Sequence, residues 1–399
     1  MNILFIAYSC SPNKGSEDRI GWKLPLAAAE NNRVVVLTKE EHRTDIEKIC
    51  SNHDLPPVRF YYVDIPAAAK RLFRGSAYSL RLNLWHRQAL PVAEEICRRE
   101  KIDIIHQITP VEFRSVGDYG RIPGVKFVCG PLGGGEYIPQ DLRRYAGGHL
   151  PAEAVRKMLN VLARGRLKRT GILDRCDALL FANAETKSWL APVLKSGTSF
   201  GMYPEVGISQ EEMIDRKENR GICHFLTPGR LIYRKGHALL LDALAQLPED
   251  LPWRCTILGN GPEKGRLKKQ CEKLGLVRRV TFLEKVPFSD MDKIYEAAHV
   301  LVMPSLRETT GSVIPEAMAR GIPVIAPNRF GGAALADDGA GWRFRTKDEL
   351  QEALRHCIQN TEAVPERGKT AALAVQSHTW QQKAAFYQHV YENILTPEG

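Results

Sequence analysis

The sequence predicts an α/β protein built from two doubly wound parallel sheets. Short apolar runs alternate with amphipathic helical patterns along the whole chain, as expected of parallel strands joined by crossover helices. This rhythm restarts after residue 220, and a chain of 399 residues is too long for one ordinary core. We therefore expect two domains, joined by a polar, glycine-containing segment near 196–221.

Apolar runs mark the candidate strands. Those before the linker lie at 2–8, 33–38, 58–63, 102–107, 125–130 and 178–183. Those after it lie at 223–229, 253–259, 279–284, 299–304 and 322–327. Ligands of such sheets bind beyond the carboxyl ends of the strands, so the residues that follow each run are the first place to look for a site.

The composition, with 44% apolar and 26% charged residues, is that of a folded, water-soluble chain. No apolar run is long enough to span a membrane, and the opening run lacks the features of a signal peptide. The nine cysteines are scattered without a C-x-x-C pair, so we expect core thiols in a reducing cytoplasm rather than disulfides or a zinc site. The net charge of +10 favours an anionic partner: a phosphorylated substrate, a nucleic acid or an acidic membrane surface.

The stretch "LRETTGSVIPEAMARGIPVIAP" (306–327) places two carboxylates near the end of one candidate strand. Glu308 lies in the loop, and Glu316 lies one turn into the following helix. Between them, Thr310 and Gly311 present small groups and backbone N–H donors at a helix start, which is how a phosphate site is built. An ordinary crossover, with acidic residues at a helix N-terminus, would explain either glutamate alone.

Two further loops follow strands of the second half. In "TPGRLIYRKGH" (227–237), Arg230 and Lys235 could clamp a diphosphate, although a solvated basic loop is the common alternative. "LGNGPEKGRL" (258–267) is a glycine-rich turn that by itself indicates only a tight strand-to-helix connection.

Taken together, these motifs carry a family resemblance. "GRLIYRKG", "ILGNGPEKGRL", "VTFLEKVPFSDM" and the E-x7-E of "ETTGSVIPE", followed by "AMARGIPVIAPNRFGG", resemble the retaining glycosyltransferases of family four, which have the GT-B fold. The resemblance is dense in the C-terminal half and looser before it. It implies two Rossmann-like domains that face each other across a cleft: an acceptor domain (1–200) and a donor domain (201–378), with a terminal helix (379–399) that crosses back onto the first.

The resemblance also implies a donor site for a nucleotide-diphosphate sugar of the UDP or GDP type, with no other cofactor and no metal. Arg230 and Lys235 would contact the diphosphate, Glu308 the donor sugar and Glu316 the ribose. The remaining donor-site positions are the backbone around Thr310 and Gly311, the turn at Gly259, and Val286 beside the base. The D-x-D of "SDMD" (289–292) is better explained as a helix cap with first-turn acids than as a metal site.

The first half resembles the family through two loops. In "SPNKGSEDRIGW" (11–22), Gly15 would face the donor phosphate and the acceptor, and "CGPLGGGEYIP" (129–139) is similar to a glycine-rich turn of one branch. Many members have a histidine near the reacting sugar, but this chain has none at the corresponding position, about Gly130. His106 is the nearest substitute, and catalytic and core roles are both open for it.

The segment 143–171 carries eight basic residues against a single acid, Glu153, with apolar residues interleaved at helical spacing. A solvated helix face is the usual meaning of such a run. An enzyme that acts on a lipid-linked acceptor could instead use it to rest on anionic headgroups at the inner face of the cell membrane. Both alternatives are open.

The sequence thus predicts a cytoplasmic, metal-independent, retaining hexosyltransferase, with Glu308 and His106 as the catalytic candidates. Its acceptor would be a glycan or a lipid-linked saccharide in bacterial surface polysaccharide synthesis, such as capsule or O-antigen assembly. One alternative is a nucleotide-sugar epimerase on the same fold. Another is a non-enzymatic basic binding protein, which would explain the charge but not the ordered donor motifs, so we expect no nucleic acid partner.

Overall fold

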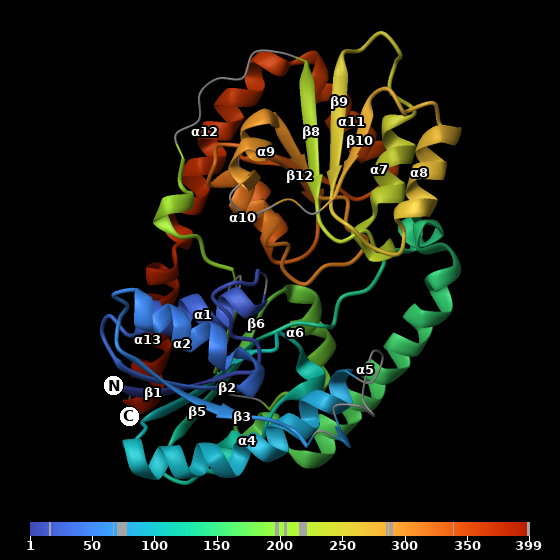
Figure 1. Ribbon diagram of the computed structural model, residues 1–399. Coiled ribbons are helices and arrows are strands. Elements are labelled where there is room, and N and C mark those ends of the chain that lie inside the picture. The colour runs from blue at the N-terminus through green and yellow to red at the C-terminus, as the bar shows by residue number, and fades with distance from the viewer. Residues whose placement is uncertain are drawn as a thin grey trace. The chain divides into compact units, whose positions relative to one another are not determined.

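The computed structural model describes residues 1–15, 17–66, 68–69, 78–195, 199–202, 206–214, 222–284, 286, 290–337 and 339–396. The chain, coloured along its length in Figure 1, divides into two compact units. The first unit comprises Met1–Gly135, Arg156–Gly207 and Trp380–Gly399, and the second comprises Glu136–Val155 and Ile208–Thr379. Within the predicted linker, residues 196–198, 203–205 and 215–221 lie outside the described residues.

The first unit contains a parallel sheet of seven strands in the order β3-β2-β1-β4-β5-β6-β7. The chain moves outward from β1 to β3, then returns beside β1 and continues from β4 to β7 on the other side. This reversal of direction makes the sheet doubly wound, as predicted. The strands are β1 (Asn2–Ala7), β2 (Arg33–Lys39), β3 (Val58–Val63), β4 (Ile104–Thr109), β5 (Lys126–Leu132), β6 (Ala178–Phe181) and β7 (Ser199–Met202).

Both faces of this sheet are buried. Alternate residues of a strand point to opposite faces, so Ile3 and Phe5 join one apolar cluster and Leu4 and Ile6 join another. The helices that carry residues of this unit are α1 (Glu17–Ala28), α2 (Arg43–Asn52), α4 (Tyr78–Glu100), α5 (Leu150–Thr170), α6 (Ala184–Leu190) and α13 (Trp380–Leu395).

Helix α13, at the end of the chain, packs against α1 in the first unit, and Figure 1 shows the two together. Its Trp380, Tyr387 and Tyr391 are buried in the same cluster as Ile3 and Phe5. The predicted return of the terminal helix to the first unit is therefore confirmed.

The second unit contains a parallel sheet of six strands in the order β10-β9-β8-β11-β12-β13. The strands are β8 (Cys223–Pro228), β9 (Trp253–Leu258), β10 (Val280–Leu283), β11 (Val300–Val302), β12 (Val324–Pro327) and β13 (Gly341–Phe344). The helices are α7 (His237–Leu244), α8 (Lys264–Lys273), α9 (Met291–Ala297), α10 (Val313–Met318), α11 (Lys347–Gln359) and α12 (Val364–Val375). Every predicted strand is present, while β7 and β13, both short and at sheet edges, were not predicted.

All nine cysteines are free thiols, and all except Cys50 are buried, as expected of core residues. Within the ranges that the structure describes, no helix has the length and apolar character needed to cross a membrane.

Candidate functional site

The candidate donor site lies at the carboxyl edge of the second sheet. Because its strands are parallel, the loops after β8, β9, β11 and β12 all leave the sheet at this edge. Those loops run over 229–236, 259–263, 303–312 and 328–332. The predicted donor residues lie in these loops, in the loop after β10 or in the helix after β11; they are Arg230, Lys235, Gly259, Val286, Glu308, Thr310, Gly311 and Glu316.

At the centre of this edge, Glu308 forms an ion pair with Lys235 that joins the loops after β11 and β8. Arg234 lies 3.9 Å from the other carboxylate oxygen, and its own carbonyl oxygen accepts hydrogen bonds from the backbone N–H groups of Leu306 and Arg307. Burial opposes ionisation of Glu308, whose side chain is 12% exposed, but the two cations lower its pKa below the usual value. Glu308 is therefore an anion at neutral pH, fixed beside a fixed cation.

Two glycines are required by the packing of these loops. At Gly311 the backbone φ is +78°, and an added Cβ would lie 2.8 Å from the Met303 sulfur. At Gly259 φ is +143°, and a Cβ would lie 1.9 Å from the carbonyl oxygen of Gly229. A side chain at Gly259 would displace the loop after β8, whereas a side chain at Gly311 would strain the backbone and push aside the Met303 side chain of the same loop.

The other predicted donor residues have looser surroundings. Glu316 is half-buried in α10 and accepts a 3.4 Å hydrogen bond from the hydroxyl of Tyr295. Val286 is half-buried against the apolar cluster beneath α9 and α10. Thr310 is half-buried, and its carbonyl oxygen accepts a hydrogen bond from Gly332. Arg230 is exposed, and its guanidinium has no partner among the residues that the structure describes.

The D-x-D aspartates each pair with a nearby cation. Asp290 lies 3.4 Å from Lys293, and Asp292 lies 2.9 Å from Arg320. Within the described ranges, no group of three or more acidic, histidine or cysteine side chains is arranged to hold a metal ion.

His106 lies inside the first unit, fully buried in β4. Its Nε2–H donates to the Gly130 carbonyl (2.8 Å), and its Nδ1 accepts from the Tyr391 hydroxyl (2.6 Å). Burial lowers its pKa to about 3, so the ring is neutral. Both ring nitrogens are engaged within the chain, which favours the core alternative for this residue over the catalytic one.

Sequence reasoning missed Glu17, the first residue of α1. One of its carboxylate oxygens accepts a 3.1 Å hydrogen bond from the backbone N–H of Val111, and the other has no hydrogen bond to the described residues. Burial raises the pKa of Glu17 to about 7, and the nearby charge of Glu112 adds to this effect. The sequence did offer one signal for Glu17, namely its position directly after the loop that contains Gly15. In the structure Gly15 lies in open space, because a Cβ added to it would meet no atom within 4 Å.

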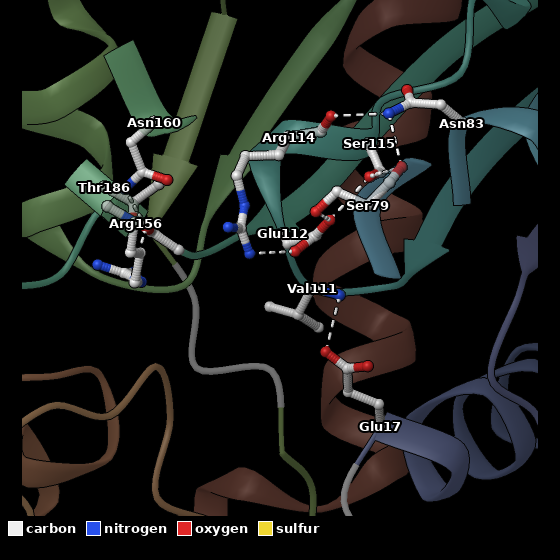
Figure 2. A network of polar contacts seen from close by, with 12 residues as sticks. Glu17, Ser79, Asn83, Val111, Glu112, Arg114, Ser115, Arg156, Asn160 and Thr186 are labelled. Atoms are coloured by element: carbon white, nitrogen blue, oxygen red, sulfur yellow. Dashed lines mark hydrogen bonds and ion pairs between the residues drawn. The ribbon is translucent and has the colours of Figure 1, made fainter. Parts of the chain in front are cut away.

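Glu112 lies on the other side of Val111 and has no free oxygen (Figure 2). It accepts hydrogen bonds from the hydroxyls of Ser79 (3.1 Å) and Ser115 (2.7 Å), and it pairs with Arg114 at 2.8 Å. Glu112 thus stabilises the loop after β4, whereas Glu17 has one carboxylate oxygen that can still accept a hydrogen bond. A carboxylate with a pKa near 7 at the carboxyl edge of a sheet can accept a proton from a substrate hydroxyl.

The predicted basic run proves to have several roles. Figure 2 shows Arg156 and Asn160 on α5, both of which donate to the Gly134 carbonyl oxygen of the glycine-rich turn, at 2.6 and 3.0 Å. Arg164 donates to the Trp189 carbonyl, and Arg166 donates to the Asn83 side chain. The remaining basic residues are exposed; on α5 these are Lys157, Lys168 and Arg169, and in the second unit Arg143 and Arg144.

The outer face of α5 is apolar. Met158 is 55% exposed and Leu162 is 61% exposed, with Leu159 and Val161 beside them. The buried Asn160 and Leu167 lie on the opposite side of the helix by its 3.6-residue period. An apolar stripe flanked by exposed cations is unusual on a helix that faces only water.

Residues 210–373 match the model of the family described as "Glycosyl transferases group 1". Among curated proteins, the chain is 33% identical over 180 residues to D-inositol 3-phosphate glycosyltransferase of Corynebacterium urealyticum; the match covers 42% of this chain and 42% of that protein. The chain thus aligns with well under half of the length of this relative. Both matches support a relationship to glycosyltransferases.

The similarity to solved structures extends over nearly the whole chain. Sucrose-phosphate synthase from Thermosynechococcus elongatus has a TM-score of 0.69 at 19% identity, with 99% of each chain covered. Anabaena HepE, solved in complex with UDP-glucose, has a TM-score of 0.64 at 18% identity, with 98% of this chain and 100% of that chain covered. The predicted GT-B fold is therefore confirmed, and residues 210–373 carry the signature of the group 1 glycosyl transferases.

Proposed function

We propose that this protein is a retaining glycosyltransferase that moves a hexose from a nucleotide-diphosphate sugar to an acceptor hydroxyl. The observation that carries the proposal is the Lys235–Glu308 ion pair. It joins two loops at the carboxyl edge of a parallel sheet, within the stretch that matches the family model. The binding of UDP-glucose by HepE supports a donor of this class.

In this proposal the donor loops divide the nucleotide sugar among them. Glu308 accepts hydrogen bonds from the sugar hydroxyls and Glu316 from the ribose. Lys235, the exposed Arg230 and backbone N–H groups near Gly311 stabilise the negative charge that develops on the leaving diphosphate. Such preorganised electrostatic stabilisation can replace a divalent metal ion. No other cofactor is required.

The acceptor is assigned to the first unit, with Glu17 as the group that receives its proton. Gly15, in open space beside Glu17, leaves room for the acceptor and the donor phosphate to approach. We propose a glycan or lipid-linked saccharide as acceptor, in bacterial surface polysaccharide synthesis such as capsule or O-antigen assembly. The exposed apolar stripe of α5 and its flanking cations would hold the protein on the inner face of the cell membrane, where such acceptors are made.

The proposal is tested by a thermal-shift screen of UDP- and GDP-sugars, followed by product analysis. A ligand at about 100 times its dissociation constant adds roughly 2.7 kcal/mol to the free energy of unfolding.

Without acceptor, the bound donor should be hydrolysed slowly to free sugar, and the rate of hydrolysis should be unchanged in EDTA. If the product is instead an epimerised nucleotide sugar, the protein is a nucleotide-sugar epimerase with the same fold. Loss of activity in EDTA and recovery with Mn²⁺ would contradict metal independence.

Glu316→Ala should leave folding intact and weaken donor binding. Removing a carboxylate from a hydroxyl pair forfeits charge-assisted hydrogen bonds worth about 1.5–3 kcal/mol. Titration calorimetry with the donor found in the screen measures this loss. Glu362→Ala, at an exposed position of the same unit, should bind donor like the unsubstituted protein. Equal donor affinity of the two variants would remove Glu316 from the site.

Glu17→Gln should raise the melting temperature at pH 8 and change it little at pH 5. The pKa of Glu17 is raised from 4.5 to about 7 on folding, so its ionisation destabilises the fold as pH rises through this range, and the neutral amide avoids that cost. Donor hydrolysis should fall by at least about 10² because a proton acceptor is lost. Glu94→Gln, an exposed change on α4, is the control. Undiminished hydrolysis would exclude Glu17 as the base.

Vesicles containing phosphatidylglycerol should bind the protein at low salt and release it as salt rises. Each cation near the membrane contributes about 1 kcal/mol, so changing Lys157, Lys168 and Arg169 to Gln should weaken binding by roughly 100-fold. Changing Lys268, Lys269 and Lys273, which are exposed on α8 of the second unit, to Gln removes the same charge from a helix other than α5 and should have little effect. If unsubstituted protein ignores these vesicles, α5 is a solvated helix and a soluble acceptor is favoured.

A further inference from the structure

The segment Glu136–Val155 lies in the first half of the sequence but packs within the second unit. Its apolar side chains Ile138, Leu142 and Tyr145 are buried in one cluster. The same cluster contains Leu231, in the loop after β8, and Leu239, in α7. The segment is therefore part of the core of the second unit.

Glu153, in the first turn of α5, makes polar contacts with two of the loops. One oxygen of its carboxylate accepts a 2.6 Å hydrogen bond from the Tyr233 hydroxyl and a 2.9 Å hydrogen bond from Arg307. Burial and the neighbouring carboxylate raise the pKa of Tyr233, so its hydroxyl keeps its proton and donates across the physiological range. Glu153 thereby joins the loop after β8 to the loop after β11.

Contacts also reach the loops after β9 and β12. The ring of His149 stacks on Tyr233, with centroids 4.2 Å apart, and its Nε2 lies 3.4 Å from Glu263 in the loop after β9. The guanidinium of Arg329, in the loop after β12, lies over the ring of Tyr137 at 4.2 Å. One short segment therefore contacts four of the loops at the edge of the candidate donor site, those after β8, β9, β11 and β12.

The contacts of Glu153 flank the central ion pair of that site. Tyr233 precedes Lys235 by two residues, and Arg307 immediately precedes Glu308. Both Glu153 and Arg307 are almost buried, and Nε of Arg307 is buried without a hydrogen-bond partner among the described residues. The Arg307 guanidinium therefore relies on Glu153 for charge compensation, because an unpaired charge in such a place is costly.

We infer that Glu136–Val155 holds the donor loops in their binding geometry and that Glu153 is a positioning residue for Lys235 and Glu308. The inference rests on the proposed function for what the loops bind. It assigns to the donor site a segment that lies outside the matched residues 210–373. A displacement of about 1 Å in such loops is enough to reduce a reaction rate by 10²-fold.

The test compares Glu153→Ala, Glu153→Gln and Tyr233→Phe with the control Asp141→Ala, an exposed acid of the same segment. The dissociation constant for UDP is measured by titration calorimetry, with GDP in parallel, and the melting temperature is measured for each variant. Glu153→Ala should weaken nucleotide binding by at least about tenfold. Glu153→Gln and Tyr233→Phe each lose part of the contact and should weaken it about threefold. Asp141→Ala should match the unsubstituted protein.

The outcomes separate the two proposals. If the unsubstituted protein binds neither nucleotide, the proposed function fails, and this inference fails with it. If it binds one of them and Glu153→Ala stays within about twofold of it, the inference alone is overturned. A role confined to folding would lower the melting temperature of the Glu153 and Tyr233 variants while leaving nucleotide affinity unchanged, which would also overturn the positioning role.

Discussion

Parallel strand pairing is the constraint on which the rest of the structure depends. Each parallel strand requires a crossover, so every strand-to-helix loop of a sheet leaves at the same edge. Residues more than seventy positions apart, such as Lys235 and Glu308, can then meet in one ion pair. The same rule places Glu17 and Glu112 on either side of Val111 in the first unit. In both units, therefore, the parallel strand order brings the loops together, and the side chains on those loops then determine the chemistry of the candidate site.

Burial of charge determines how the loops of the second unit are arranged. A buried carboxylate is costly unless a cation lies beside it, and here Lys235 compensates Glu308 while Arg307 compensates Glu153. Glu17 is the contrasting case, because a single backbone N–H does not offset its burial and its pKa rises to about 7. The second unit thus holds Glu308 as an anion suited to accepting hydrogen bonds, whereas the first unit holds Glu17, which can exchange a proton.

The sequence was sufficient for the α/β class, for the predicted strands and for the return of the terminal helix, because apolar periodicity is a local signal. The sequence was insufficient where the surroundings of a residue depend on a contact with a residue far away in the chain. The environment of His106 depends on Tyr391, 285 residues away, and no local pattern shows that both ring nitrogens are engaged. The charge of the run at 143–171 is visible in the sequence, but the internal contacts of Arg156 and Arg166 are not. The short edge strands β7 and β13 carry too few apolar residues to stand out.

The boundary of the recognisable motifs differs from the boundary of the folded unit. The family match begins at residue 210, yet Ile138, Leu142 and Tyr145 fill part of the core of the second unit. Large apolar side chains in such places are each worth about 2–5 kcal/mol, comparable with the net stability of a domain. A second unit defined by the motifs alone would therefore lack both part of its core and the carboxylate that joins two of its loops. The chain passes from the first unit to the second directly after three successive glycines, where Gly134 has a φ of +101° and a Cβ on Gly135 would lie 2.6 Å from the Cα of Thr186.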